Sequence, residues 1–134
     1  MRFNRLRGDR GQTLIEFALA SVVFFVMIFG TIEFGLAIYR YNMVADLAQE
    51  GARWAAVHGG TSASPATAAQ LQTYVQGRSP GFTVTVTATP ANPSAVGPGG
   101  IIAVQVNSAF APVTSLIPST TLNLQSTARM TVFR

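Results

Sequence analysis

Cysteine and lysine are both absent from the 134 residues of this chain. Without cysteine, disulfides, thiolate metal ligands and a cysteine nucleophile are all excluded. Charge is scarce as well, since charged residues make up 10% of the chain and apolar residues 49%. A soluble domain usually carries about a quarter charged residues. The composition is therefore atypical of a cytosolic domain.

Acidic residues are absent after Glu50, and the single histidine is His58. The later part of the chain has no pair of carboxylates for acid–base catalysis, and its hydroxyl groups have no partner base nearby in sequence. A metal site needs second and third ligands, which the sequence does not offer. We expect His58 to cap carbonyl groups at the end of a helix. The sequence thus predicts that the protein is not an enzyme and has no catalytic, cofactor-binding or metal-binding residues.

Residues 1–11 form a basic leader that ends in Gly11. It contains one acid, Asp9, and four arginines: Arg2, Arg5, Arg7 and Arg10. A nucleic-acid-binding protein spreads its basic residues over a folded surface, so we expect no nucleic acid as a partner. Arginines beside an apolar segment instead hold that end of the chain in the cytoplasm. They predict the orientation of a membrane protein.

The longest apolar run covers residues 14–39 and is interrupted by Glu16, Thr31 and Glu33. As a helix, its uncharged centre of residues 17–32 is roughly 24 Å long, and the flanks extend it to the ~20 residues that cross a bilayer. A cleaved secretory signal is the alternative, but no Ala-x-Ala-like site follows the run. We therefore expect one crossing of the cytoplasmic (inner) membrane, with the N-terminus inside and the C-terminal part outside.

The helical pattern continues beyond the membrane segment. Apolar residues at spacings of three and four form a stripe that we expect to pack against a sheet: Leu47, Gly51, Trp54 and Ala55. Polar residues are expected on the opposite side: Asp46, Gln49, Glu50 and Arg53. Because no proline precedes Pro65, one helix is predicted over residues 12–58, with residues 14–39 in the membrane and residues 40–58 amphipathic.

Residues 59–134 are predicted to form a small extracytoplasmic domain. Residues 61–64 and Pro65 suit the start of a short helix over residues 66–76. Three later segments alternate apolar and polar residues, as half-buried strands do: residues 82–89, 102–107 and 122–132. The expected fold class is α+β and pilin-like, with a long transmembrane and amphipathic helix, a short second helix and a small three-stranded antiparallel sheet.

The segment Gly11-Gln12-Thr13-Leu14-Ile15-Glu16-Phe17 lies where the chain enters the membrane. A carboxylate one turn inside an apolar helix is costly, so Glu16 is a candidate functional residue, although a position near the headgroups and the helix N-terminus also favours it. Glu33 lies roughly 25 Å further along the helix, near the outer interface. It is explained either by solvation there or by a contact with another subunit. Arg40 lies about two turns away, too far for direct pairing.

A basic leader that ends in glycine, with glutamate five residues later, resembles the cleavage site of class-III type IV prepilins, where a membrane aspartyl peptidase cuts after the glycine. The resemblance implies a cut between Gly11 and Gln12. Four further segments resemble the TadE-like family: Glu16-Phe17-Ala18-Leu19, Ile32-Glu33-Phe34-Gly35, Tyr41-Asn42 and Glu50-Gly51-Ala52-Arg53-Trp54-Ala55-Ala56-Val57. Many members carry a proline near the position of Val22, but this chain has no proline there.

The family resemblance implies a membrane-anchored minor pilin or pseudopilin of a tight-adherence, type IVb-like pilus. Its expected partners are a prepilin peptidase, other pilin-like subunits, the inner-membrane assembly platform and membrane lipid. Glu16, Phe17 and Glu33 are the expected intersubunit residues. Two alternatives share the leader or the anchor: a pseudopilin of a type II-like secretion system, and an uncleaved single-pass anchored binding domain.

Overall fold

The structure is a computed structural model that describes the backbone of residues 8–114 and 121–133, and side chains from residue 11 onward. Its elements, in chain order, are α1 (Gly8–Val57), α2 (Ala68–Arg78), β1 (Thr85–Thr89), the short 3₁₀ helix η1 (Pro93–Ala95), β2 (Ile101–Phe110) and β3 (Leu122–Thr131). The three strands form one antiparallel sheet in the order β1-β2-β3. The expected α+β class, with a long first helix, a short second helix and a three-stranded sheet, is confirmed.

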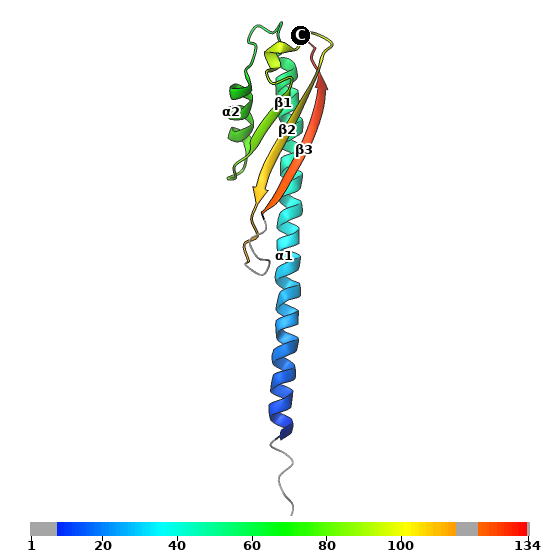
Figure 1. The fold of residues 1–134 in the computed structure, drawn as a ribbon, viewed down its shortest axis with the longest axis vertical. Helices are drawn as coiled ribbons and strands as arrows, with labels where there is room; N and C mark the ends of the chain where they lie inside the picture. The colour runs from blue at the N-terminus through cyan, green and yellow to red at the C-terminus, as the bar shows by residue number, and fades with distance from the viewer. Residues whose placement is uncertain (1–7, 115–120, 134) are drawn as a thin grey trace, which may run out of the picture.

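Helix α1 runs the length of the molecule (Figure 1). Its 50 residues correspond to roughly 75 Å, and it passes Val22 without a break. The described helix includes Gly8–Gly11, ahead of the predicted start at Gln12. Gly11 does not interrupt it, because glycine lowers helix stability by only about 1 kcal/mol and keeps its backbone hydrogen bonds. At its other end, His58 Nδ1 donates to the Trp54 carbonyl at 2.8 Å. The expected capping role of His58 is confirmed.

The sheet has one apolar and one polar face. In β2 the residues Ile102, Val104 and Val106 are buried, and they alternate with residues that are half-buried or exposed. Val106 pairs with Val86 of β1, and Val104 pairs with Ala128 of β3. The apolar residues of all three strands therefore face the same side, as the period-two pattern predicted.

Two helices cover the apolar face of the sheet. The C-terminal half of α1 packs on β2 and β3, and α2 packs on β1 and on α1 (Figure 1). Leu71 and Val75 are the buried residues of α2. From the sequence, only the apolar stripe of α1 was expected to cover the apolar face of the sheet. The apolar pattern of α2 is weaker, and its residues 69, 70, 73 and 77 are exposed.

The start of α2 differs from the expectation that Pro65 opens the helix. Thr67 is the N-cap, since its side chain accepts from the Gln70 N–H while the Gln70 side chain accepts from the Thr67 N–H at 2.9 Å. This reciprocal pair satisfies two backbone donors that a helix start otherwise leaves free. It outweighs the preference of Pro65 for a first helical position.

Candidate functional site

The entry segment of the predicted membrane helix is exposed throughout. Gly11 and Gln12 lie near the first turn of α1, where backbone N–H groups lack intrahelical partners and fraying is least costly. Glu16 and Phe17 also point outward, Phe17 with 70% exposure. The expected leader residues Arg2, Arg5 and Arg7 lie outside the described residues, and Arg10 is described only by its backbone. The exposed segment leaves room for a partner along this part of α1.

Residues 11–32 of α1, which we call the exposed span, touch little of the rest of the protein. All are exposed except half-buried Ser21. Within the described residues, one helical segment, Gly11–Val57, is long and apolar enough to cross a membrane, and its most apolar part is not buried by protein. The hydroxyls of Ser21 and Thr31 donate to the carbonyls four residues earlier, each at 2.8 Å. Hydroxyls that are hydrogen-bonded within the helix, together with exposed apolar side chains, are compatible with a single-pass membrane anchor.

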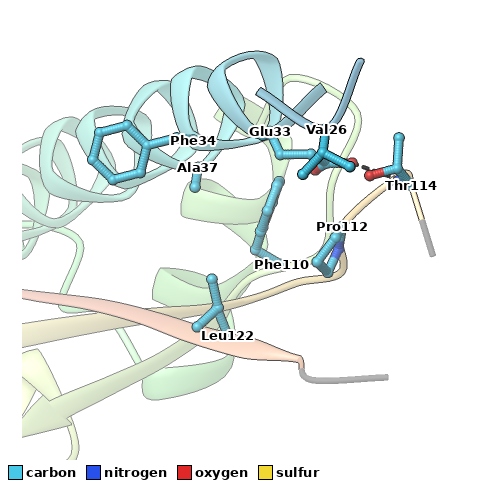
Figure 2. A pocket seen from close by; sticks show the side chains of 9 residues that line it. Val26, Glu33, Phe34, Ala37, Phe110, Pro112, Thr114 and Leu122 are labelled. Carbon is cyan, nitrogen blue, oxygen red and sulfur yellow. Dashed lines mark hydrogen bonds between the residues drawn. The ribbon is translucent and has the colours of Figure 1, made fainter. Parts of the chain in front are cut away.

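Glu33 marks the end of the exposed span. It is only 8% exposed, and its Oε1 accepts the Thr114 backbone N–H at 2.5 Å (Figure 2). This bond ties α1 to the chain that follows β2. The sequence suggested interfacial solvation or an intersubunit contact for Glu33 and did not indicate this bond within the chain. Arg40 does not pair with Glu33 but lies over the Phe82 ring, 4.4 Å from its centroid.

The four residues of the expected packing stripe lie on the covered side of α1. Leu47, Gly51 and Ala55 are buried. A Cβ at Gly51 would lie 2.9 Å from Val75 Cγ2, so α2 approaches α1 there more closely than any side chain allows. Trp54 is half-buried rather than fully in the core. Its ring stacks between those of His58 and Tyr74, with centroid distances of 4.2 and 4.9 Å.

Glu50 was expected to face solvent, but it lies at the edge of the α1–α2 contact, with 37% of its side chain exposed. It forms an ion pair with Arg78 at 2.8 Å and accepts the Tyr74 hydroxyl at 3.0 Å, because α2 covers this second side of α1. Burial raises the pKa of the Tyr74 phenol, and the hydrogen bond and charge of Glu50 raise it further. The phenol therefore remains a proton donor to Glu50 at neutral pH. In the sequence, the position of Glu50 at the start of the Glu50–Val57 motif was the feature that could have indicated its contact with Tyr74 and Arg78.

Potential metal ligands are not clustered in the part of the chain that the structure describes. Residues 8–114 and 121–133 contain no group of three or more His, Cys, Asp or Glu side chains placed to hold a metal ion. The distinctive features of the described residues are the exposed span, the Glu33–Thr114 hydrogen bond and the contact between α1 and α2.

A known family model matches part of the chain. Residues 11–53 match the family model described as TadE-like protein. The match covers 43 of the 134 residues and agrees with the family resemblance of the sequence motifs. Searches of curated proteins and of solved structures gave no match. The matched segment runs from the glycine of the entry motif through the exposed span to the packed face of α1.

Proposed function

We propose, from its match to the TadE-like family model, that the chain is a minor pilin or pseudopilin of the tight-adherence pilus. A prepilin peptidase would cut it between Gly11 and Gln12, and α1 would anchor it in the inner membrane. Its partners would be other pilin-like subunits and the assembly platform. The N-terminus would face the cytoplasm, because the arginines of the leader oppose its transfer across the membrane.

The division of α1 into two halves is the observation that carries this proposal. Residues 11–32 present apolar side chains to the surroundings, whereas the half beyond Val44 holds the sheet and α2. Such an exposed span is stable in lipid, or packed against the same span of another subunit. In a bundle of these helices, the Glu16 carboxylate lies one turn from the new ammonium group of Gln12. Where water is excluded, this ion pair between neighbouring subunits would contribute to their association.

The cleavage is tested by the mass of the full-length protein purified from cells with and without the prepilin peptidase. We expect a mature chain that begins at Gln12 only when the peptidase is present. Gly11→Val should block the cut, since a branched side chain replaces hydrogen at the cleavage site. Gly35→Val is the matched control, because Gly35 is also a glycine of α1 at which an added Cβ would meet no atom within 4 Å.

Two results would replace the proposal. A wild-type protein that retains Met1 in the presence of the peptidase indicates an uncleaved, single-pass anchored binding domain. A cleaved protein that co-purifies with a type II-like secretion system, and with no pilus component, indicates a secretion pseudopilin.

A further inference from the structure

Glu33 directly follows the exposed span and is the first buried residue of α1 among the described side chains, ahead of the packed half that starts at Val44. The exposed span of residues 11–32 is roughly 33 Å long, close to the ~30 Å of a hydrocarbon core. In the membrane anchor proposed above, Glu33 therefore lies at the level of the lipid headgroups. The inference below depends on that anchoring and is independent of any role in a pilus.

One oxygen of the Glu33 carboxylate is left without a donor. Oε1 accepts the Thr114 N–H, whereas Oε2 is buried and has no hydrogen-bond partner among the described residues. Arg40 is the next basic residue along α1, and its guanidinium lies over the rings of Phe82 and Phe110, 4.4 and 5.6 Å from their centroids. A buried carboxylate oxygen is stabilised most by a donor that carries positive charge. The site is complementary to such a donor.

The cavity beside Glu33 has a volume of about 450 Å³ and is lined mainly by apolar side chains, including Val26, Phe34, Phe110 and Leu122. Figure 2 shows Glu33 directed at Thr114, with Phe110 and Pro112 beside it. Because Val26 lines the cavity seven residues before Glu33, the cavity extends roughly 10 Å along α1 into the exposed span. Gly30 lies between them and leaves this side of the helix open, with no atom within 4 Å of where a Cβ would stand. This apolar cavity has a carboxylate at the end that would lie level with the lipid headgroups, so it fits an amphiphile with a cationic head.

We propose that this cavity binds a phosphatidylethanolamine molecule, with its primary ammonium on Glu33 Oε2 and an acyl chain along Val26 and Gly30. A primary ammonium brings three N–H donors and a positive charge to the oxygen that lacks both. All three lipids carry a phosphate anion, but phosphatidylglycerol has no cation to offset it beside the carboxylate, and the quaternary ammonium of phosphatidylcholine has no N–H to donate. The site therefore distinguishes three lipids that share the same acyl chains.

Binding is measured by native mass spectrometry of the full-length protein in detergent, titrated with each of these three lipids. We expect wild type to bind phosphatidylethanolamine at least about tenfold more tightly than the other two, the effect of one hydrogen bond to a charged group. Glu33→Gln keeps an acceptor for Thr114 but loses the charge, so it should lose the preference. Gly30→Leu fills the cavity and should weaken binding of phosphatidylethanolamine by a similar factor.

Matched controls separate the site from general effects on the helix. Glu16→Gln removes a carboxylate from the other end of the exposed span, and Gly35→Leu adds the same side chain away from the cavity lining. Both should retain the wild-type preference. Circular dichroism should show wild-type helix content for all four variants.

Several results would overturn the inference. They are an equal affinity of wild type for the three lipids, or a Glu33→Gln variant that keeps the preference. A protein partner lost from Glu33→Gln in the absence of any lipid preference would assign the carboxylate to a cationic side chain of that partner. Extraction of wild type from membranes by carbonate would overturn the anchoring itself. A wild type that remains in the membrane without lipid preference overturns this inference alone.

Discussion

Gly51 shows how one residue sets the distance between α1 and the elements packed on it. A Cβ there would lie 2.9 Å from Val75 Cγ2 and 3.3 Å from Val104 Cγ1. Val75 belongs to α2 and Val104 to β2, so both neighbours are held in place by their own elements. Both are β-branched and have restricted side-chain rotation. The glycine of the Glu50–Val57 motif therefore has a steric reason to be there.

Gly51→Ala should destabilise the protein. Overpacking of this kind costs about 1–3 kcal/mol, which exceeds the ~0.5–1 kcal/mol that alanine contributes to a helix. Gly77→Ala in α2 is the matched control, because its Cβ would meet no atom within 4 Å. That variant should be neutral or slightly stabilised. Thermal unfolding in detergent, followed by circular dichroism, tests both, and a Gly51→Ala protein at least as stable as Gly77→Ala would contradict the steric argument.

At the scale of elements, α2 protects the free edge of β1. The Gln72 side-chain amide donates to the Val84 carbonyl at 2.8 Å and accepts the Val86 N–H at 2.7 Å. Gln76, one turn later, donates to the Phe82 carbonyl at 3.0 Å and accepts the Val84 N–H at 2.9 Å. Each amide thus binds the strand as a neighbouring backbone would. An unpaired edge is a site for association with other chains, and these glutamines cover it.

Gln72→Leu should therefore lower stability by about 1–3 kcal/mol, since it leaves the Val84 carbonyl, just before β1, and the Val86 N–H of β1 without partners. Leucine has a similar size and a good helix propensity, so the effect reports the hydrogen bonds. The same change at exposed Gln49 of α1 should stay within about 0.5 kcal/mol of wild type. Unfolding is measured by denaturant titration, and size-exclusion chromatography should show self-association of Gln72→Leu only. Equal stability of the two variants would refute the protective role of α2.

At the scale of the whole molecule, folding and assembly use different parts of α1. The buried core gathers residues from Val44 onward, and no residue of the exposed span belongs to it. Changes within the exposed span should thus leave the fold intact. They should alter only what the helix meets outside its own chain.

Glu16→Leu separates these two parts. The variant removes a carboxylate from an apolar segment, so it should insert, fold and be cleaved at least as well as wild type. It should fail to co-purify with other pilus components, because the ammonium of a neighbouring Gln12 loses its partner. Glu16→Gln should lie between the two. Ser21→Ala is the control, since the Ser21 hydroxyl bonds the Phe17 carbonyl of its own helix, and it should assemble normally.

The measurement is the recovery of pilus components with tagged protein, together with leader cleavage and protein abundance. An abundant, cleaved Glu16→Leu protein that recovers as many components as wild type would show that Glu16 has no intersubunit role. Its carboxylate would then serve only the membrane interface and the helix N-terminus.

Local patterns predicted the elements well, and they failed where a particular side-chain contact decides the outcome. The single long helix and the strand alternation were found from spacing alone. Glu50 was misplaced because the pattern of α1 contains no information on where α2 lies. The start of α2 was misplaced because Thr67 and Pro65 both suit a helix start, and only the pairing of Thr67 with Gln70 decides between them.

Periodicity along the chain was sufficient to predict that α1 is long, apolar in its first half and amphipathic in its second, and that three half-buried strands follow. These properties depend on residues within a few positions of one another, where periodicity, glycine and proline act directly. The packing of the elements, in contrast, sets the hydrogen bonds of Gln72 and Gln76 along β1 and the residues before it, the contact of Gly51 with Val75, and the bond of Glu33 to a backbone N–H 81 residues away. Such contacts join residues that are distant along the chain. No local pattern specifies which of them meet, because that depends on how the helices pack on the sheet.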